Sequence, residues 1–265
     1  MLKSFALRTS LIMDKFFATV TENSDYIVIK TPQRPDYFWG NYIIMKSPPT
    51  HGDFEEWISI FEREIGPRNE LGYVAIGIDT IDGDDCAVEE FKENGFDIQV
   101  SKILLAENII KPRKFNDLIE VRPYSSEEDW ANYLEIHFTP DWNYGTEAEQ
   151  KEFLKDEMES FRRFVESGNA QRYGAFLNGE MIAELGVFWE RNVARFNNVA
   201  THSDHRRKGA CSSLVYHVSK IMLDRDEITT LVMEADEDYH AARIYEEVGF
   251  EPTQRLISLE WVKDN

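Results

Sequence analysis

The chain alternates short apolar runs with charged segments, a pattern typical of strands and amphipathic helices in succession. Two apolar runs flank Asn178-Gly179, a dipeptide that strongly indicates a β-hairpin. Residues 147–166 are highly charged but repeat apolar side chains at helical spacing, which predicts a long helix. Ser125, with a glutamate three residues later, predicts the start of another helix that ends near His137.

The second half of the chain reads as a mixed α/β (α+β) fold. We expect strands at 119–124, 173–177, 180–189, 193–201, 228–234 and 255–262, and further helices at 209–224 and 241–247. The first half repeats the later part of this plan, with strands expected at 38–45, 73–79 and 99–106 and helices at 53–64 and 87–93. Such agreement in order and spacing favours an internal duplication, although α/β units share element order and chance is the alternative.

A turn-rich segment at residues 107–116 is the best candidate for a boundary between the halves. We therefore predict a domain at 1–116 and a second at 117–265. The copies match letter by letter at intervals near their ends: Ala87, Phe91, Gly95 and Phe96 against Ala241, Tyr245, Gly249 and Phe250.

Composition and charge exclude several classes of function. The 265 residues are 42% hydrophobic and 29% charged, with a net charge of −20, which argues against binding to nucleic-acid phosphates or to an anionic membrane. No apolar stretch approaches the ~18–20 residues that a membrane span needs. The two cysteines have neither disulfide-scaffold nor metal spacing, so we expect a cytoplasmic protein.

Residues 199–214 combine a strand end, a basic turn and a helix start. Backbone N–H groups at a helix N-terminus are unpaired and partly positive, so this arrangement suits a phosphate or pyrophosphate. Gly209 lets the backbone approach a ligand closely, and Arg206, Arg207 and Lys208 add positive charge. By composition alone, a solvated basic turn is an equal alternative. A Walker A loop is excluded, because the G-x-x-x-x-G-K-[ST] pattern is absent.

This turn resembles the coenzyme A pyrophosphate motif of the GNAT N-acetyltransferase superfamily, [QR]-x-x-G-x-[GA], with Arg206, Gly209 and Cys211 in the marked places. Residues 238–250 resemble that superfamily's closing motif, N-x-x-A-x-x-x-Y-x-x-x-G-F. The resemblance covers residues 119–265 well. The first half resembles the family only as a degenerate copy, which is similar to bacterial members of the family that have two parts. Cys211 replaces the usual Gly or Ala, and Asp238 replaces the usual Asn.

The resemblance implies two GNAT-like units, each a mixed, mostly antiparallel sheet flanked by helices. It also implies a site for acetyl-CoA as cosubstrate, in which a strand backbone pairs with the pantetheine arm and the basic turn holds the pyrophosphate. The residues expected to bind it are Val199, Ala200, Thr201, Arg206, Arg207, Lys208, Gly209, Ala210, Cys211, Ser212, Asp238 and Ala241.

By the same resemblance, Tyr245 would protonate the leaving thiolate, a task that suits a hydroxyl with a pKa of ~10. The alternative is a packed aromatic residue with a satisfied hydroxyl. The general base is less legible. Glu184 or Glu190, on one predicted strand, could act directly or through water, although an exposed strand carboxylate is the simpler interpretation.

Three further patterns bear on ligands. His202 and His205 flank Asp204, but no third ligand has suitable spacing, so we expect no metal. The acidic run 234–238 could attract a cationic amine, or could simply be solvated. In the first half, the equivalent turn, residues 46–52, contains two prolines, which lack N–H groups, and Phe91 stands in place of Tyr245.

These observations together favour an acetyl-CoA-dependent N-acetyltransferase, an acyltransferase that moves an acetyl group directly to a primary amine of a small molecule or peptide. The alternative is a non-catalytic acyl-CoA-binding regulatory protein with the degenerate half as a partner surface. We expect no nucleic-acid or membrane partner, and a monomer or homodimer. The identity of the amine is not encoded in any pattern of the sequence.

Overall fold

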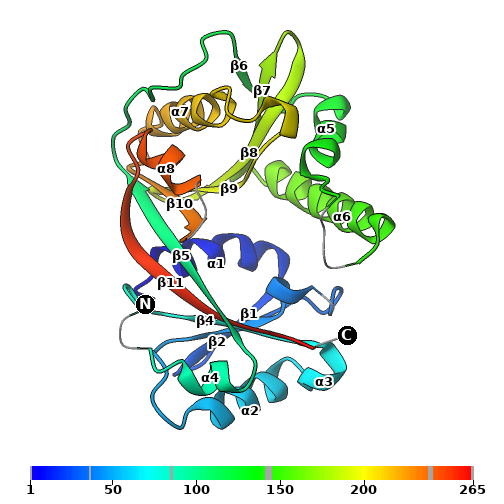
Figure 1. The fold of residues 1–265 in the computed structure, drawn as a ribbon, viewed down its shortest axis with the longest axis vertical. Coiled ribbons are helices and arrows are strands. Elements are labelled where there is room, and N and C mark those ends of the chain that lie inside the picture. Colours follow the sequence, from blue (N-terminus) through cyan, green and yellow to red (C-terminus); the bar gives the residue numbers. More distant parts are fainter. Residues whose placement is uncertain (1, 36, 84–85, 141–144, 238–240, 264–265) are drawn as a thin grey trace. The chain divides into compact units, whose positions relative to one another are not determined.

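A computed structural model describes residues 2–35, 37–83, 86–140, 145–237 and 241–263 as alternating strands and helices, which confirms the mixed α/β class (Figure 1). Clustering of residue contacts divides the chain into two units. Unit 1 comprises Met1–Ile103, Glu234–Tyr239 and Pro252–Asn265, and unit 2 comprises Leu104–Met233 and His240–Glu251. The functional division at residue 116 stays a prediction. None of the helices in the described ranges has the length and apolar composition needed to cross a membrane.

Unit 1 is a twisted sheet with α1 on one face and the other helices on the opposite face (Figure 1). Its strands pair in the order β1-β2-β3-β4-β11-β5, antiparallel at β1–β2, β2–β3 and β4–β11 and parallel at β3–β4. The elements are α1 (Phe5–Phe17), β1 (Thr19–Glu22), β2 (Tyr26–Lys30), the 3-10 helix η1 (Phe38–Gly40), β3 (Tyr42–Met45), α2 (Phe54–Glu64), α3 (Arg68–Leu71), β4 (Tyr73–Ile78), α4 (Glu89–Glu93), β5 (Asp97–Ala106) and β11 (Glu251–Val262).

Unit 2 has strand order β10-β9-β8-β7-β6, in which only the β9–β10 pair is parallel. Helices α5 and α6 cover one face, and α7 and α8 cover the other (Figure 1). Its elements are β6 (Glu120–Pro123), α5 (Glu127–His137), α6 (Glu147–Glu166), β7 (Ala170–Leu177), β8 (Glu180–Glu190), β9 (Val193–Thr201), the 3-10 helix η2 (Ser203–His205), α7 (Ala210–Leu223), β10 (Thr230–Asp236) and α8 (Ala241–Glu246).

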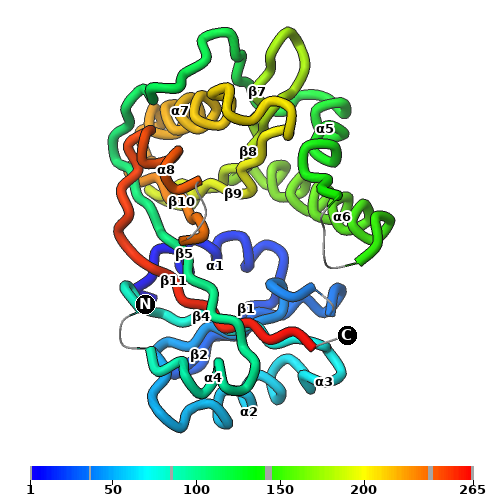
Figure 2. The backbone as a smooth tube through the Cα atoms, viewed as in Figure 1, coloured from blue at the N-terminus to red at the C-terminus, as the bar shows by residue number. Residues whose placement is uncertain are grey.

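The last strand of the chain closes the sheet of unit 1. β11 pairs with β4 over six residue pairs, from Ile257 opposite Ile78 to Val262 opposite Tyr73. Figure 2 shows this C-terminal trace, in red, beside strands from the first hundred residues. In the hydrogen-bonded order β11 separates β4 from β5, the strand that follows β4 in sequence. The strand expected at the end of the second repeat therefore completes the sheet of the first.

Several predicted boundaries were wrong. The strand expected over residues 38–45 begins only at Tyr42, after a 3-10 turn. The capping residue of α5 is Ser126 rather than Ser125, because Ser126 accepts a hydrogen bond from the Asp129 amide and the Asp129 carboxylate accepts one from the Ser126 amide. The sequence patterns also missed α1, β1, β2 and α3.

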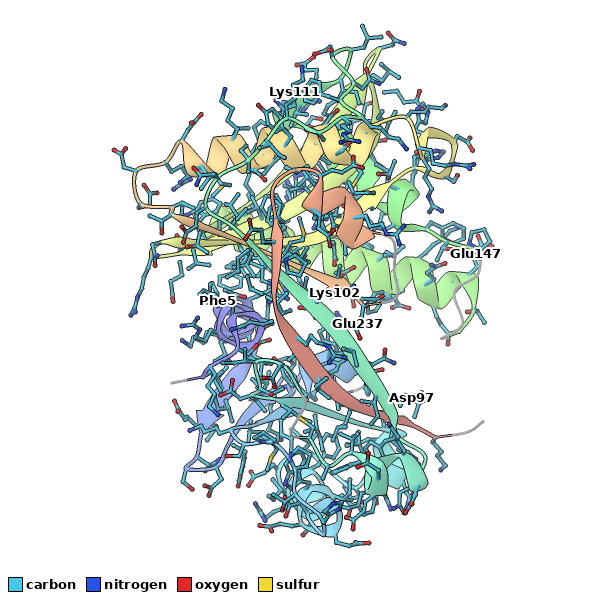
Figure 3. All side chains as sticks on the ribbon, turned by 60° about the vertical axis from the view of Figure 1, so that its left-hand side comes forward. Phe5, Asp97, Lys102, Lys111, Glu147 and Glu237 are labelled. Carbon is cyan, nitrogen blue, oxygen red and sulfur yellow. The ribbon has the colours of Figure 1, made fainter. Side chains whose placement is uncertain are left out.

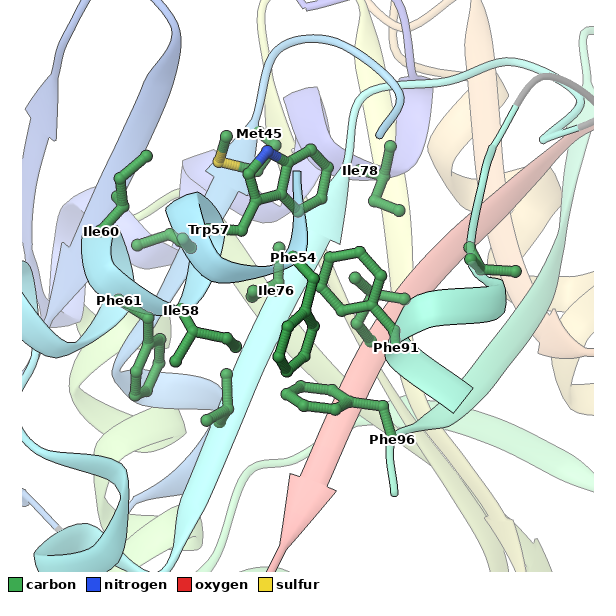
Figure 4. Close-up of a cluster of buried hydrophobic side chains, with 14 of the residues drawn as sticks. Met45, Phe54, Trp57, Ile58, Ile60, Phe61, Ile76, Ile78, Phe91 and Phe96 are labelled. Atoms are coloured by element: carbon green, nitrogen blue, oxygen red, sulfur yellow. The ribbon is translucent and has the colours of Figure 1, made fainter. Parts of the chain in front are cut away.

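The core of unit 1 is an aromatic and aliphatic cluster between the sheet and helices α2 and α4 (Figure 4). Every residue of β4 is buried, as expected of a strand covered on both faces. Phe91 lies at the centre and is 1% exposed. Its ring centroid lies 5.3 Å from that of Phe54, 5.5 Å from that of Trp57 and 5.6 Å from that of Phe96. These contacts give Phe91 a packing role.

We expect Phe91→Ala to lower the free energy of unfolding of unit 1 by ~3–5 kcal/mol, because it removes a buried ring and leaves a cavity. Phe16→Ala is the matched control: that ring is 42% exposed, so its loss should change stability by ~0.5 kcal/mol or less. Urea denaturation followed by circular dichroism measures both. Equal effects of the two substitutions would contradict the central position of Phe91.

Candidate functional site

Strand β9 carries an irregularity where the pantetheine arm is expected to pair. Opposite β8, the register advances from Gly186–Asn197 to Glu184–Ala200, so β9 has one residue more than its partner. Asn198 lies within this bulge and has a φ of 47°, a value uncommon for non-glycine residues. The pairing of β9 with β10 reaches only Arg195, opposite Val232. Beyond it, the edge of β9 that includes Val199, Ala200 and Thr201 has no partner strand within the described part of unit 2.

The basic turn follows β9 and leads into α7. Arg207 and Gly209 both adopt left-handed backbone conformations, with φ of 62° and 82°. The first helical hydrogen bond joins the Ser213 amide to the Gly209 carbonyl at 3.0 Å, so the preceding amides, of Ala210, Cys211 and Ser212, are not used by the helix. Successive amides in such conformations form a concave anion site.

The positive charges of this turn are available to a ligand. Arg206, Arg207 and Lys208 are all exposed, and none forms an ion pair among the described residues. The Nε of Arg206 donates a 3.4 Å hydrogen bond to the carbonyl of Thr201. This geometry brings the predicted pyrophosphate residues together at the N-terminus of one helix.

The segment before β6 forms hydrogen bonds with the first turn of α7. The Lys114 carbonyl accepts a 2.7 Å hydrogen bond from the Ser212 hydroxyl, and the Ser213 hydroxyl accepts a 2.8 Å bond from the Asn116 amide. A Cβ on Gly209 would lie 2.6 Å from the Lys114 carbonyl oxygen. Gly209 is therefore needed for packing as well as for its backbone conformation, and its replacement would disturb the turn itself.

The other predicted coenzyme residues occupy mixed surroundings. Cys211 is half-buried, and desolvation raises the pKa of its thiol to about 12, so the thiol stays protonated near neutral pH. Ala241 begins α8 and is half-buried. Asp238 lies outside the residues that the structure describes. Tyr245 lies on α8, is 5% exposed and packs edge-to-face against Phe250 with a centroid separation of 6.4 Å.

Glu184 is not the exposed strand carboxylate that the simpler interpretation expected. It is fully buried on β8 and forms a bidentate ion pair with Arg172 on β7, with both N–O distances 2.7 Å. The Tyr124 hydroxyl donates to the same carboxylate at 3.2 Å, and the Nε2 of His137 also contacts it. Burial alone would raise the pKa of Glu184, but Arg172 and His137 hold it below its usual range.

Aromatic rings enclose the guanidinium of Arg172. Its central carbon lies 4.6 Å from the centroid of the Tyr133 ring and 4.7 Å from that of the Phe161 ring. A Cβ on Gly186 would lie 2.7 Å from the Phe161 ring, so this glycine makes room for the stack. The Nη1 atom of Arg172 is buried without a hydrogen-bond partner among the described residues. The ion pair is thus closely packed as well as buried.

A second chain of hydrogen bonds connects this cluster to the bulge in β9. The Tyr133 hydroxyl donates to the carboxylate of Glu157 on α6 at 2.6 Å. The side-chain amide of Asn198 donates to the other oxygen of Glu157 at 2.9 Å. Burial raises the pKa of Tyr133, so its hydroxyl remains a donor. The helices on this face therefore hold the bulge in place.

The remaining acidic candidates are not members of the Arg172–Glu184 cluster. Glu190 is exposed at the far end of β8, opposite Val193, which is seven residues or ~23 Å of strand from Ala200. Glu237, in the acidic run, belongs to unit 1. Figure 3 labels it near Lys102 on β5. Its carboxylate pairs with Arg255 at 3.0 Å and its carbonyl accepts from the Nζ of Lys102 at 3.3 Å. Attraction of a cationic amine by this run stays a prediction.

Sequence reasoning missed His137, Arg172 and Tyr133. The spacing of Trp130, Tyr133 and His137 at i, i+3 and i+7 places all three on one face of α5, and this periodicity could have indicated a buried histidine. No local sequence pattern indicates a role for Arg172. Its partner Glu184 lies on the neighbouring strand, and only the register of the hairpin brings the two residues together.

Comparisons with known proteins bear on the family of one part of the chain and on its fold. Residues 129–250 match the acetyltransferase (GNAT) family, which confirms the family resemblance over that range. No curated protein matches the chain.

Solved structures with a similar fold include the following three. One is a conserved protein of unknown function from Staphylococcus epidermidis, with a TM-score of 0.72, 15% identity and coverage of 93% of this chain and 95% of that one. A GCN5-related N-acetyltransferase from Kribbella flavida has a TM-score of 0.67, 13% identity and coverage of 97% and 96%. A tandem GNAT protein from the clavulanic acid biosynthesis pathway has a TM-score of 0.56, 13% identity and coverage of 84% and 74%.

We expect Glu184→Gln to destabilise unit 2 by ~3–5 kcal/mol, because it leaves the Arg172 charge buried without its counter-ion. Replacing both partners, in the double variant Arg172→Met with Glu184→Leu, should restore most of this stability, since no charge is then buried. Urea denaturation of the wild type, the single variant and the double variant measures the difference. A double variant that is no more stable than the single one would contradict this account.

Proposed function

We propose that the protein transfers the acetyl group of acetyl-CoA to a primary amine of a small molecule or peptide, because residues 129–250 match the GNAT acetyltransferase family. The observation that carries this proposal is the combination of an unpaired strand edge at 199–201 with an anion-binding turn at Gly209. The experiment that tests it is release of coenzyme A thiol from acetyl-CoA in the presence of a panel of primary amines.

The chain's own groups fit acetyl-CoA as a substrate. The backbone of Val199–Thr201 can accept the pantetheine amides as an added strand would. The helix amides of Ala210–Ser212 and the charges of Arg206–Lys208 suit the pyrophosphate. Binding at these two places would fix the thioester relative to the acceptor, and positioning of this kind accounts for much of the rate of a direct transfer.

Tyr245 is the proposed general acid. A tyrosine hydroxyl stays protonated at neutral pH and can donate its proton to the thiolate that leaves. We expect Tyr245→Phe to lower kcat by ~10²–10⁴-fold and to leave the Kd for coenzyme A nearly unchanged, because the ring and its packing on Phe250 remain. Steady-state kinetics and calorimetric titration measure the two quantities. A variant with wild-type turnover would assign Tyr245 a packing role only.

We propose a single coenzyme site per chain, in unit 2. In unit 1, the turn before α2 contains Pro48 and Pro49, which have no N–H to donate. Two of its amides already donate to carboxylates: the Thr50 amide to Asp53 at 2.6 Å and the Gly52 amide to Glu90 at 3.0 Å. Two negative charges thus stand where a pyrophosphate would bind, and they would repel it.

We expect calorimetric titration with coenzyme A to give a stoichiometry near one. The triple variant Arg206→Ala, Arg207→Gly, Lys208→Ala keeps the left-handed backbone of the turn and should raise the Kd by ~10- to 100-fold, through loss of one or two charge-assisted hydrogen bonds. Lys46→Ala, in the corresponding turn of unit 1, is the matched control and should leave the Kd unchanged. Two sites per chain would contradict the proposal.

A further inference from the structure

The buried cluster of unit 2 holds a histidine that the roles proposed so far do not use. His137 is the last residue of α5, and its Nε2 contacts the carboxylate of Glu184. Its ring stacks on that of Tyr133, one turn earlier, with a centroid separation of 4.3 Å and an interplanar angle of 32°. The side chain is 15% exposed, so part of the ring reaches solvent.

The place of this histidine is set by the register of the sheet. Glu184 on β8 lies directly opposite Ala200 on β9, in the middle of the segment proposed to hold the pantetheine arm. Side chains of directly opposed residues point to the same face of a sheet. His137 therefore lies over the face of β9 that carries Ala200, beside the bulge whose Asn198 is held by Glu157.

Glu184 is poorly suited to be the base itself. One of its oxygens accepts from the Nε of Arg172 and from the Tyr124 hydroxyl, and the other accepts from the Nη2 of Arg172 and contacts His137. The carboxylate is fully buried, and its pKa is held below its usual range by Arg172 and His137 despite the opposing effect of burial. A carboxylate in this state binds a proton weakly.

The same ionised carboxylate fixes the tautomer of His137. An acceptor at Nε2 requires that Nε2 carry the proton, so the neutral ring has an unprotonated Nδ1. Within the described residues, Nδ1 has no hydrogen-bond partner. The pairing orients the ring in the way that a buried carboxylate orients a catalytic histidine in hydrolases.

We propose that His137 is the general base of the acetyl transfer and that Glu184 is its positioning residue. This inference rests on the function proposed above. The nitrogen of the amine bonds to the thioester carbonyl carbon, and the carbon–sulfur bond breaks. The proton lost by the amine passes to Nδ1 of His137, while the departing thiolate takes the proton of Tyr245. The imidazolium then returns its proton to water, and the tyrosine regains one from water.

His137 contacts two titratable groups directly, Glu184 and Tyr133, and others are linked to it through these two, including Tyr124, whose hydroxyl donates to Glu184. Arg172 on β7 is paired with Glu184, and Glu157 on α6 accepts from the Tyr133 hydroxyl. The pKa of Arg172 and that of Tyr133 are both raised, so these groups keep their protons in the neutral range.

The first test needs no acceptor. Nitrogen-15 NMR of the histidine rings in the free protein, with the His137 signals assigned by their loss in His137→Gln, reports which ring nitrogen carries the proton. We expect a neutral ring protonated at Nε2 at pH 8. A ring protonated at Nδ1, or one that stays doubly protonated up to pH 9, would overturn the proposal.

The second test is kinetic. Acetyl-CoA is supplied with spermidine, tyramine and a blocked lysine peptide, and the amine that the wild type uses fastest is retained as the probe. His137→Gln preserves a donor toward Glu184 but removes the base, so we expect kcat to fall ~10²-fold or more with the Kd for coenzyme A unchanged. His217→Gln, which replaces a half-buried histidine on α7, is the matched control and should retain wild-type kcat.

Chemical rescue separates a base from a structural residue. Added imidazole should restore turnover to His137→Ala in proportion to its neutral form and should not change the wild type. If the wild type is active and His137→Gln turns over at the same rate, this inference is wrong and the proposed function still stands. No thiol release by the wild type with any of the amines would overturn both.

Discussion

The ion pair between Arg172 and Glu184 is the constraint around which unit 2 is organised. A single buried charge costs several kcal/mol, so neither residue is tolerable without the other in correct geometry. The hairpin of β7 and β8 must therefore adopt one register, because a slip by one residue would turn one partner to the opposite face. The flanking rings of Tyr133 and Phe161 then fix where α5 and α6 pack.

This constraint extends to the strand that is proposed to bind the pantetheine arm. Glu184 faces Ala200 across the β8–β9 pairing, and the adjacent bulge at Asn198 is held by Glu157. Side chains on one face of the sheet thus hold the strand that is proposed to bind the pantetheine arm. Its edge at 199–201 has no partner strand within the described part of unit 2 and is left for a ligand. A site built on strands and braced by buried groups keeps its geometry better than one built on loops.

The sequence predicted the parts of this architecture that local chemistry determines. Helix α6 was located to the residue, because its charged face and apolar repeat leave little choice, and the Asn178-Gly179 turn located the hairpin. The basic turn before α7 could be predicted because Gly209 and three cationic residues are adjacent in sequence. The buried ion pair of Glu184 could not be predicted from the sequence. A single carboxylate in a strand is equally compatible with a solvated side chain until its partner is known. The partnership of β11 with β4 was hidden for the same reason.

The position of β11 has a consequence for how the chain reaches its folded state. The sheet of unit 1 includes residues 252–262, so the first hundred residues leave the ribosome with β4 unpaired on one edge. That edge must wait until residues 257–262 have been made, and an unpaired apolar strand invites non-native association meanwhile. Contacts between positions so distant in sequence also slow folding. The sheet that contains the first hundred residues is therefore completed only after unit 2 has been made.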